Sequence, residues 1–471
     1  MDENKGYRAT IGLEIHAELK TKTKMFCDSR NDPEERRPNV NICPVCMAHP
    51  GTLPVINKEA VKHVVKVGAA LGGTIADFTE FDRKNYFYPD IPKGYQISQY
   101  KYPLISGGSL NGVKITRVHL EEDTARSSHD KGDYTLIDFN RAGIPLMELV
   151  TEPVVKSAEE ASAFARELQL LLRYLGAGDA NMEKGEMRVE ANISVSKDDT
   201  YGTKVEVKNL NSFKVVEKAI DYEIKRQIEL IESGGKVSQE TRGWNEAKQE
   251  TFSQRAKESS HDYRYFPDPD LPKLKLSEIP ELSVEVLRKE MPELPWERRN
   301  RMLKSFGLKE EAAELFVQDI PLGTFFENVV AGKSADFIKL SANYITSDLM
   351  SLMKSGAAGN MPSTGSFRAL MDMVVSGKLS SRGAKDTLAI MHAEGGNPEE
   401  IAKTSGLIQE SDEGKLREVV EKIISANSDA VKEYKSGKEA SLQFLIGQGM
   451  KEAKGSANPQ VLKELFLANL K

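Results

Sequence analysis

The sequence predicts an α+β fold, in which an antiparallel sheet with flanking helices is followed by helical modules. Segments that alternate apolar and polar residues with a period of two, which is typical of half-buried strands, occur in the first part of the chain. The stretch 266–295 contains six prolines and separates this part from the rest. Beyond Pro295 the apolar residues follow helical spacing.

Three segments carry the strand prediction. In residues 11–20, IGLEIHAELK, apolar residues alternate with a polar set that includes Glu14 and His16. The same alternation occurs in residues 188–195, RVEANISV, and in residues 204–208, KVEVK. Clean alternation favours antiparallel strands with one polar face over buried parallel strands.

Helices are expected both among the strands and after them. One is predicted over 57–72, a second begins at a capping box that starts with Ser157, and a third spans 213–232. The first of three further apolar stripes at helical spacing begins at Leu416, after an expected cap at Asp412, and the last of them follows Pro459. Short helices with short connections predict a small bundle at this end of the chain.

Length and composition narrow the class of protein. The 471 residues exceed a typical single domain several times over, so two to four domains are expected. No run of about 18 apolar residues occurs, so no membrane span is expected. The segment MDENKGYRAT lacks the apolar stretch of a secretory signal. Three cysteines do not make a disulfide framework, and a cytoplasmic location is therefore expected.

Charge is unevenly distributed along the chain. The formal net charge of −6 excludes a uniformly basic nucleic-acid binder. Residues 415–471 hold ten basic and seven acidic side chains, whereas the residues before them hold 55 and 64. A polyanion is therefore expected to bind at the C-terminal end, although a solvated helical face explains the same composition.

The common nucleotide-binding signatures are missing. The sequence has no G-x-x-x-x-G-K-[ST] loop, no G-x-G-x-x-G pattern and no G-x-S-x-G elbow. If the chain uses ATP, it must bind it at an uncommon kind of site.

Acidic residues and histidine recur on the polar strand faces. Glu14 and His16 share one face of the first segment, and Glu190 and Glu206 belong to the polar sets of the other two. A further run, HLEED, occupies 119–123. Carboxylates with an imidazole suit Mg²⁺ or Mn²⁺. The alternative interpretation is the solvated face of an antiparallel sheet, and the residues alone favour that alternative.

Residues 81–100 combine several aromatic rings with Arg83, Lys84 and Lys93. Aromatic and basic side chains in this arrangement stack on a base and hold phosphates. A proline-stiffened loop whose rings cover the core has the same composition. Residues 261–272, HDYRYFPDPDLP, allow the same two interpretations.

The three cysteines are Cys27 and the pair Cys43-x-x-Cys46. A C-x-x-C pair is half of a zinc site, and Cys27 would supply a third thiolate. His49 is close in sequence but is not a standard fourth ligand. Zinc binding and three reduced core thiols are both open interpretations.

Taken together, these segments resemble the GatB/GatE family, and GatB in particular, which is the B subunit of the aspartyl/glutamyl-tRNA(Asn/Gln) amidotransferase. GatE has an additional inserted domain, for which this chain has little room. The matching segments are collinear from residue 11 to residue 459 and read IGLEIHAELKTKTKMFC, FDRKNYFYPD, HLEEDTARS, DFNRAGIPLMELVTEP, VEVKNLNSFK, HDYRYFPDPDLP and FLIGQGMKEAKGSANP.

The resemblance implies three domains. A cradle-like domain that holds ATP, Mg²⁺ and the 3′ end of the aminoacyl-tRNA is expected over 1–294. An all-α helical domain is expected over 295–407, and a C-terminal YqeY-like helical bundle that binds tRNA over 408–471.

The resemblance also implies a reaction. The side-chain carboxylate of mischarged Glu-tRNA(Gln) or Asp-tRNA(Asn) is phosphorylated by ATP and then amidated. The family's metal-binding positions fall on Glu14, His16, Glu122 and Glu206, which are also the expected catalytic residues. Glu121 and Glu190 are neighbours that would complete a second Mg²⁺ site or the polar wall.

Residues that contact the nucleotide are expected from their chemistry. Arg83, Lys84 and Lys208 would offset the charge of the triphosphate, and Tyr86 and Tyr88 would face the adenine or the terminal adenosine of the tRNA.

The resemblance implies partners. The sequence has no glutaminase signature, so ammonia is expected from a glutaminase, the A subunit, which the small C subunit joins to the B subunit in a heterotrimer. Zinc-bearing members have C-x-C followed by C-x-x-C, but here Ser29 stands where the second cysteine belongs, so a structural zinc on Cys27, Cys43 and Cys46 is left open. The other two hypotheses are a non-catalytic tRNA-binding scaffold and a stand-alone metal-dependent kinase.

Overall fold

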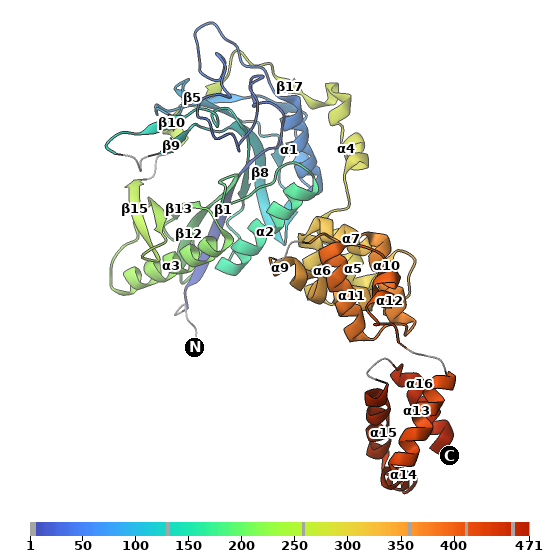
Figure 1. Cartoon of the computed structure of the whole chain (residues 1–471). Helices are drawn as coiled ribbons and strands as arrows, with labels where there is room; N and C mark the ends of the chain where they lie inside the picture. The colour runs from blue at the N-terminus through green and yellow to red at the C-terminus, as the bar shows by residue number, and fades with distance from the viewer. Residues whose placement is uncertain are drawn as a thin grey trace. The chain divides into compact units, whose positions relative to one another are not determined.

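The computed structural model describes residues 6–128, 132–256, 260–356, 359–409, 413–453 and 457–470. The chain divides into two compact units, Met1–Pro295 and Trp296–Lys471. The first unit contains a large sheet with helices, and the second is helical (Figure 1). A change from strands to helices close to Pro295 agrees with the change in sequence pattern.

A ten-stranded sheet forms the centre of the first unit. Its neighbouring strands pair antiparallel, as predicted, except that β13 and β14 run parallel, so the prediction is wrong for that pair. The strands in order across the sheet are β15 (Glu250–Ala256), β14 (Glu240–Asn245), β13 (Val205–Leu210), β12 (Met187–Ser196), β1 (Arg8–Glu18), β11 (Pro145–Thr151), β8 (Val113–Glu122), β6 (Ile105–Ser106) and β2 (Thr74–Ile75), with β7 (Ser109–Leu110) paired to β8.

Three helices pack against this sheet, and all three were expected from the sequence. They are α1 (Lys58–Ala70), α2 (Ala158–Tyr174) and α3 (Phe213–Glu232). Their N-caps are Asn57, Ser157 and Ser212, whose side chains accept hydrogen bonds from backbone N–H groups of the first turn. Figure 1 shows these helices along the outer side of the curved sheet. The opposite face of the central strands is therefore left for polar side chains.

The alternation in β1 shows how the sequence produces these two faces. Ile11, Leu13 and Ile15 are at most 1% exposed and belong to the core. Glu14 and His16 alternate with this apolar row and point to the other side, because successive strand residues face opposite sides. Burial of the apolar row fixes the register, since a shift by one residue would put Glu14 and His16 into the core.

Smaller sheets assemble the aromatic segments. The strand β4 (Asp82–Asn85) lies between β5 (Tyr95–Ser98) and β16 (Phe266–Pro267), so that Arg83 pairs with Phe266. The two aromatic segments that are far apart in the sequence are thus neighbours in space. The remaining small sheets join β3 (Phe78–Thr79) to β17 (Leu274–Lys275) and β9 (Arg126–Ser128) to β10 (Leu136–Asp138).

The first unit ends in short helical segments. The 3₁₀ turns Ser260–Tyr263, Leu276–Glu278 and Pro280–Leu282 precede α4 (Val284–Glu290), which contacts α1. This arrangement fits the proline-rich composition, because proline fixes one backbone angle and prevents long regular elements.

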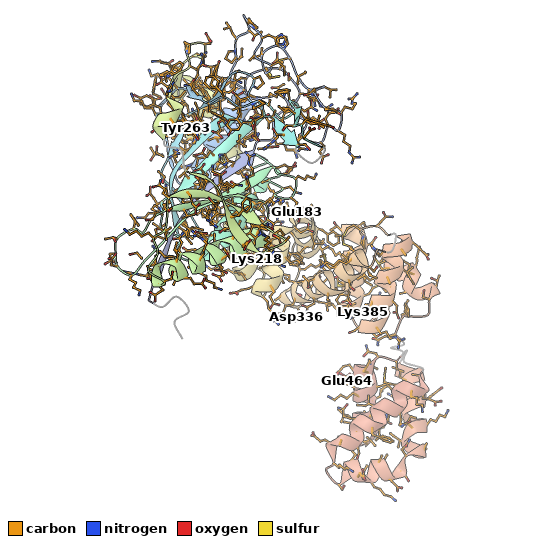
Figure 2. The ribbon with its side chains drawn as sticks, turned by 90° about the vertical axis from the view of Figure 1, so that its left-hand side faces the viewer. Glu183, Lys218, Tyr263, Asp336, Lys385 and Glu464 are labelled. Carbon is orange, nitrogen blue, oxygen red and sulfur yellow. The ribbon has the colours of Figure 1, made fainter. Side chains whose placement is uncertain are left out.

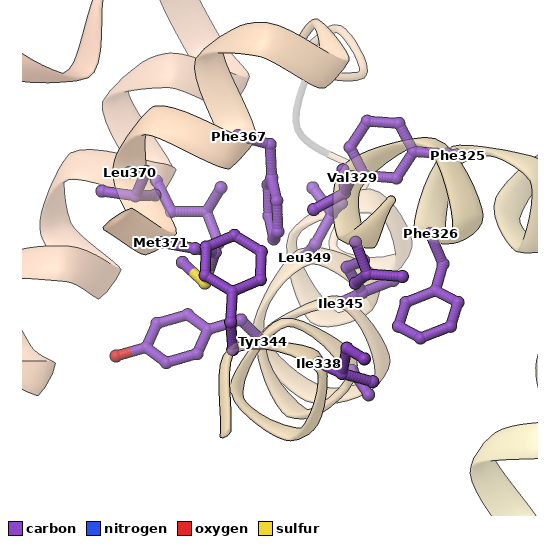
Figure 3. Close-up of a cluster of buried hydrophobic side chains, with 14 of the residues drawn as sticks. Phe325, Phe326, Val329, Ile338, Tyr344, Ile345, Leu349, Phe367, Leu370 and Met371 are labelled. Atoms are coloured by element: carbon purple, nitrogen blue, oxygen red, sulfur yellow. The ribbon is translucent and has the colours of Figure 1, made fainter. Parts of the chain in front are cut away.

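The larger core of the second unit is aromatic and aliphatic. Phe316 and Phe326 stack with their ring centroids 4.4 Å apart. Phe325 meets Phe367 edge-on at 5.4 Å, and Figure 3 labels both rings. The helices that build this core are α5 (Pro295–Lys304), α6 (Glu310–Gln318), α7 (Ile320–Val330), α8 (Ala335–Asn343), the π-helical turn Tyr344–Leu349, α9 (Met350–Lys354), α10 (Thr364–Val375), α11 (Ser381–Glu394) and α12 (Pro398–Thr404).

A separate core holds the last four helices together. Its centre includes Leu416, Val420, Leu445 and Phe466, all at most 1% exposed. The helices are α13 (Glu413–Ala426), α14 (Ser428–Lys435), α15 (Glu439–Glu452) and α16 (Pro459–Leu470), and the predicted small bundle is confirmed. The expected cap at Asp412 lies outside the described residues. Among the helices that are described, none is long and apolar enough to cross a membrane.

Candidate active site

Strand pairing places acidic and imidazole side chains in one row across the sheet. His16 of β1 pairs with Glu148 of β11, which in turn pairs with His119 of β8. On the other side of β1, Glu14 pairs with Glu190 of β12. Directly paired residues project from the same face, so five strands, β13 included, supply one polar surface.

His16 lies at the centre of this row. Its Nε2 atom is 3.4 Å from Glu148 Oε2, 3.5 Å from Glu121 Oε1 and 3.9 Å from Glu14 Oε1. His119 Nε2 approaches the same Glu148 oxygen at 3.6 Å. Sequence reasoning missed Glu148, which lies in the apolar run PLMELV; the only signal was a single carboxylate inside that run.

A second carboxylate group lies beside the first. One oxygen atom from each of Glu14, Glu190 and Glu206 lies within 4.8 Å of the other two. Lys208 Nζ is 2.9 Å from Glu190 Oε2 and 3.7 Å from Glu206 Oε2. Thr241 donates a hydrogen bond of 2.8 Å to Glu206. The predicted residues Glu14, Glu190, Glu206 and Lys208 are therefore brought together.

Burial and like charges perturb these groups. Desolvation, with the charges of Glu148 and Glu190, raises the pKa of Glu14 to about 7. Burial opposes protonation of His16, but its hydrogen bond to Glu148 and the surrounding carboxylates raise its pKa to about 9. Burial lowers the pKa of His119 to about 4. Without a bound cation the carboxylates thus favour the protonated form of His16, whereas burial favours the neutral form of His119. A metal ion held by His16 would have to displace that proton.

Lys84 faces the row from the aromatic segment. Burial is the largest single influence and disfavours its charge, but Glu121, Glu148 and the neighbouring tyrosines together outweigh burial and raise the pKa of the ammonium. Its Nζ lies 5.0 Å from the ring centroid of Tyr263 and 6.0 Å from that of Tyr86. Tyr263 is labelled in Figure 2 on the sheet-containing unit. Lys84 is therefore an ammonium held between carboxylates and rings.

The other residues expected at the nucleotide are Arg83, Tyr86 and Tyr88. Arg83 is bound to Asp268 at 2.7 Å and to Asp270 at 3.0 Å, so its charge is already paired. Tyr86 and Tyr88 have ring centroids 6.2 Å apart, and Tyr88 is 57% exposed. Tyr88 is thus exposed, Tyr86 is partly buried beside Lys84, and Arg83 lies in the β4–β16 pairing.

A cavity of about 220 Å³ opens over the polar row. Its lining includes Lys84, the stacked rings of Tyr100 and Tyr265, whose centroids are 4.2 Å apart, and Glu148. A larger cavity of about 780 Å³ lies around Glu18 and its ion-pair partner Arg141. The smaller cavity is the better candidate, because it alone of the two contains the grouped histidine and carboxylates.

Glu122 is not part of this group. Its carboxylate binds Lys93 at 2.7 Å and accepts a hydrogen bond from the Ile97 N–H at 3.0 Å. Glu121, one residue earlier in β8, is the residue that contacts His16. The expectation that Glu122 joins Glu14 and His16 is not supported by this geometry, since adjacent strand residues face opposite sides.

The cysteines form a separate cluster. The Sγ atoms of Cys27, Cys43 and Cys46 lie within 4.8 Å of one another, and those of Cys43 and Cys46 are 3.9 Å apart. Ser29 Oγ is 3.7 Å from Cys46 Sγ. The hydrogen bond from Cys27 lowers the pKa of Cys46 to about 4.

Residues 9–280 match the family model described as GatB/GatE catalytic domain, and residues 324–470 match the model described as GatB domain. The chain belongs to the GatB/GatE family. All residues of the polar row lie within the GatB/GatE catalytic-domain match.

Curated relatives agree with this family. The chain is 42% identical to a protein from Carboxydothermus hydrogenoformans, with 98% of each chain covered. It is 42% identical to one from Thermodesulfovibrio yellowstonii over 99% of each, and 44% identical to one from Dehalococcoides mccartyi strain CBDB1 over 98% of each. All three GatB/GatE relatives are named as the B subunit of an aspartyl/glutamyl-tRNA(Asn/Gln) amidotransferase.

Proposed function

We propose that this chain is the B subunit of a tRNA-dependent amidotransferase that converts mischarged Glu-tRNA(Gln), Asp-tRNA(Asn) or both to the amide form. The observation that carries the proposal is the row of His16, Glu148 and Glu121 beside Glu14, Glu190 and Glu206, in a chain with full-length relatives of that name. The A and C subunits would complete a cytoplasmic heterotrimer, in which the A subunit releases ammonia from glutamine.

The carboxylate group suits Mg²⁺. Three carboxylate oxygens within 4.8 Å repel one another, and Lys208 supplies one positive charge against them. A hard divalent ion, which prefers such ligands, would offset the remaining negative charge. Glu121 Oε2 is buried and has no hydrogen-bond donor among the described residues. The residues that we propose to hold Mg²⁺ are Glu14, His16, Glu121, Glu148, Glu190 and Glu206. Bound there, Mg²⁺ would neutralise charge on the phosphates of ATP.

The surrounding cations and rings would bind the rest of the nucleotide. Lys84 and Lys208 flank the carboxylates and would contact phosphate oxygens. Tyr86 and Tyr88 would stack on the adenine or on the terminal adenosine of the tRNA, because aromatic rings accept a base on their faces. Arg83, which is paired with Asp268, would hold the aromatic segment in place.

The reaction needs two displacements. The γ-phosphoryl group passes from ATP to the side-chain carboxylate of the aminoacyl-tRNA, which gives ADP and a mixed anhydride. Ammonia then attacks the carbonyl carbon, phosphate leaves, and the attacking nitrogen loses a proton to give the amide. A free carboxylate does not react with ammonia near pH 7, so the phosphate supplies the leaving group that the second displacement requires.

We propose that the domains divide this work. The cradle over 1–294 would perform the chemistry, the helical domain over 295–407 would connect it to the tail, and the YqeY-like bundle over 408–471 would bind tRNA. The charge distribution supports the last role, because the bundle holds exposed lysines that reach phosphates, among them Lys432, Lys435, Lys438 and Lys451.

The cysteine cluster suits a structural Zn²⁺. Metal–sulfur bonds of about 2.3 Å in a tetrahedron set the sulfur atoms about 3.8 Å apart, close to the 3.9 Å between Cys43 and Cys46. Cys27 would be the third ligand.

Reconstitution with the A and C subunits tests the function. We expect release of phosphate from ATP and formation of amidated tRNA only with a mischarged tRNA, and Glu206→Gln should remove both. Phosphate release on some other carboxylate without tRNA would indicate a stand-alone kinase. Full activity of Glu206→Gln would indicate a scaffold whose partner performs the chemistry.

A further inference from the structure

Lys24 is a buried cation next to the cysteine cluster. Lys24 is 0% exposed, and it is one of the largest fully buried side chains that the structure describes. The ammonium donates a hydrogen bond to the carbonyl oxygen of Phe139 at 3.1 Å and lies 3.8 Å from Cys46 Sγ. Within the described ranges, no carboxylate lies at ion-pair distance from it. A charge buried in this way is costly unless an opposite charge lies beside it.

The fold holds Lys24 in this position from both sides. Its backbone N–H donates to the Ser29 carbonyl at 2.9 Å, and the next N–H, of Met25, donates to the Gly143 carbonyl at 2.7 Å. Gly143 has φ +85°, and a Cβ atom there would lie 3.6 Å from Lys24 Cδ and 3.7 Å from Cys46 Cβ. The turn at Gly143 therefore packs on the lysine stem and on the cysteine together.

Ser29 lies against the same sulfur atom. Its Oγ is 3.7 Å from Cys46 Sγ, so it stands at the edge of the cluster where a fourth ligand would approach. Three thiolates and a divalent ion carry a net charge of −1, which one ammonium cancels. A fourth thiolate at residue 29 would instead leave the buried cluster with an uncompensated negative charge.

We propose that Lys24 is the positioning residue that makes a three-thiolate metal site on Cys27, Cys43 and Cys46 electrically neutral, with Ser29 at the fourth corner. The proposal deepens the zinc site proposed above and rests on it. It is independent of the amidotransferase reaction.

Metal binding by the purified full chain tests this proposal. The probes are Zn²⁺, measured by competition with a chelator, and Co²⁺, whose thiolate charge-transfer absorption increases with the number of sulfur ligands. Lys24→Met should weaken Zn²⁺ binding at least about tenfold. Lys22→Met, the same change at an exposed position two residues away, should leave binding unchanged.

Ser29→Cys gives a second, charge-sensitive readout. It should strengthen the Co²⁺ absorption, and Lys24→Met should then cost more affinity than in the parent protein, because the complex carries one more negative charge. Lys24→Gln keeps a donor for the Phe139 carbonyl and is the neutral variant to use where Lys24→Met does not fold.

Three outcomes would overturn the proposal. Unchanged Zn²⁺ affinity in a folded Lys24 variant would show that the ammonium is not the counter-charge. An equal loss with and without Ser29→Cys would show that Lys24 acts by packing rather than by charge. Absence of Zn²⁺ and Co²⁺ binding by the parent chain would overturn this inference and the zinc site together, while reconstituted amidation would still report separately on the proposed reaction.

Discussion

Glu121 and Glu122 are adjacent in β8, yet their carboxylates lie on opposite sides of the sheet. Glu121 Oε1 is 3.5 Å from His16 Nε2, whereas Glu122 Oε1 is 2.7 Å from Lys93 Nζ. Both residues are at most 5% exposed, so neither is a solvated surface acid. Glu121 and Glu122 are therefore both buried, but their carboxylates lie in two different environments.

The first prediction separates these two residues. Glu121→Gln should raise the Mg²⁺ concentration for half-maximal ATP cleavage by at least about tenfold, because it removes a buried oxygen ligand next to His16. Glu122→Gln should leave that concentration unchanged within about twofold. The measurement is a Mg²⁺ titration of phosphate release in the reconstituted complex. Equal Mg²⁺ dependence of the two variants would contradict the proposed ligand set.

The second prediction concerns the carboxylates of β1 and β13. Glu14→Ala or Glu206→Ala should abolish ATP-dependent amidation and leave glutamine hydrolysis by the A subunit intact, since both lie only in the proposed phosphoryl-transfer site. Glu217→Ala, on α3 away from the polar row, is the control and should keep amidation. Near-normal amidation in both site variants would refute the metal assignment.

The third prediction concerns the tail. Ile408 forms a β-bridge with Leu379, and the Gln409 N–H donates to the Lys378 carbonyl, so a truncation after Gln409 retains these two contacts of the helical domain. We expect the apparent KM for mischarged tRNA to rise at least about tenfold, or about 1.4 kcal/mol. Binding should also become less sensitive to salt, because fewer phosphate contacts release counterions.

A charge variant provides the matched control for the truncation. Changing exposed lysines to glutamine keeps the bundle core and should reproduce much of the loss; the positions are Lys432, Lys435, Lys438 and Lys451. Unchanged tRNA binding by the folded truncation would place recognition elsewhere in the chain.

The fourth prediction concerns pH and stability. Burial in α1 lowers the pKa of His63 below its ordinary value of 6.5, so below that value the unfolded chain binds more protons than the folded one. Its contribution to stability is therefore present above about pH 6.5 and decreases as the pH falls. His63→Gln keeps a donor for the Lys20 carbonyl, which His63 Nε2 contacts at 3.1 Å, but does not titrate.

Denaturant unfolding of the parent protein and of His63→Gln, measured between about pH 8 and about pH 5, tests the predicted loss of stability. The stability of the parent relative to His63→Gln should fall as the pH decreases. A constant difference over this range would show that His63 does not contribute to the acid sensitivity.

Several elements were predicted correctly because their determinants are local. The caps Ser157 and Ser212 start α2 and α3, and the period of two in β1 puts Glu14 and His16 on one face. Each of these features depends on residues within a few positions of one another, so the chain itself contains the information. The metal-ligand set stays a prediction.

Other features depend on which strands become neighbours. Glu148 joins the row only because β11 pairs with both β1 and β8, and Glu121 rather than Glu122 joins it because the register of β8 sets the face. The parallel pairing of β13 and β14 follows from the course of the chain between them, which contains the helix α3.

The sequence by itself thus determined the family, the strand and helix segments and the polar faces, because periodicity, caps and long collinear motifs depend only on residues that are close together in the sequence. Only the tertiary structure decided which carboxylates meet at His16 and that Lys24 lies buried against Cys46. The physical reason is that these contacts join residues 22 to 132 positions apart, and strand register and core packing, not local pattern, set such distances.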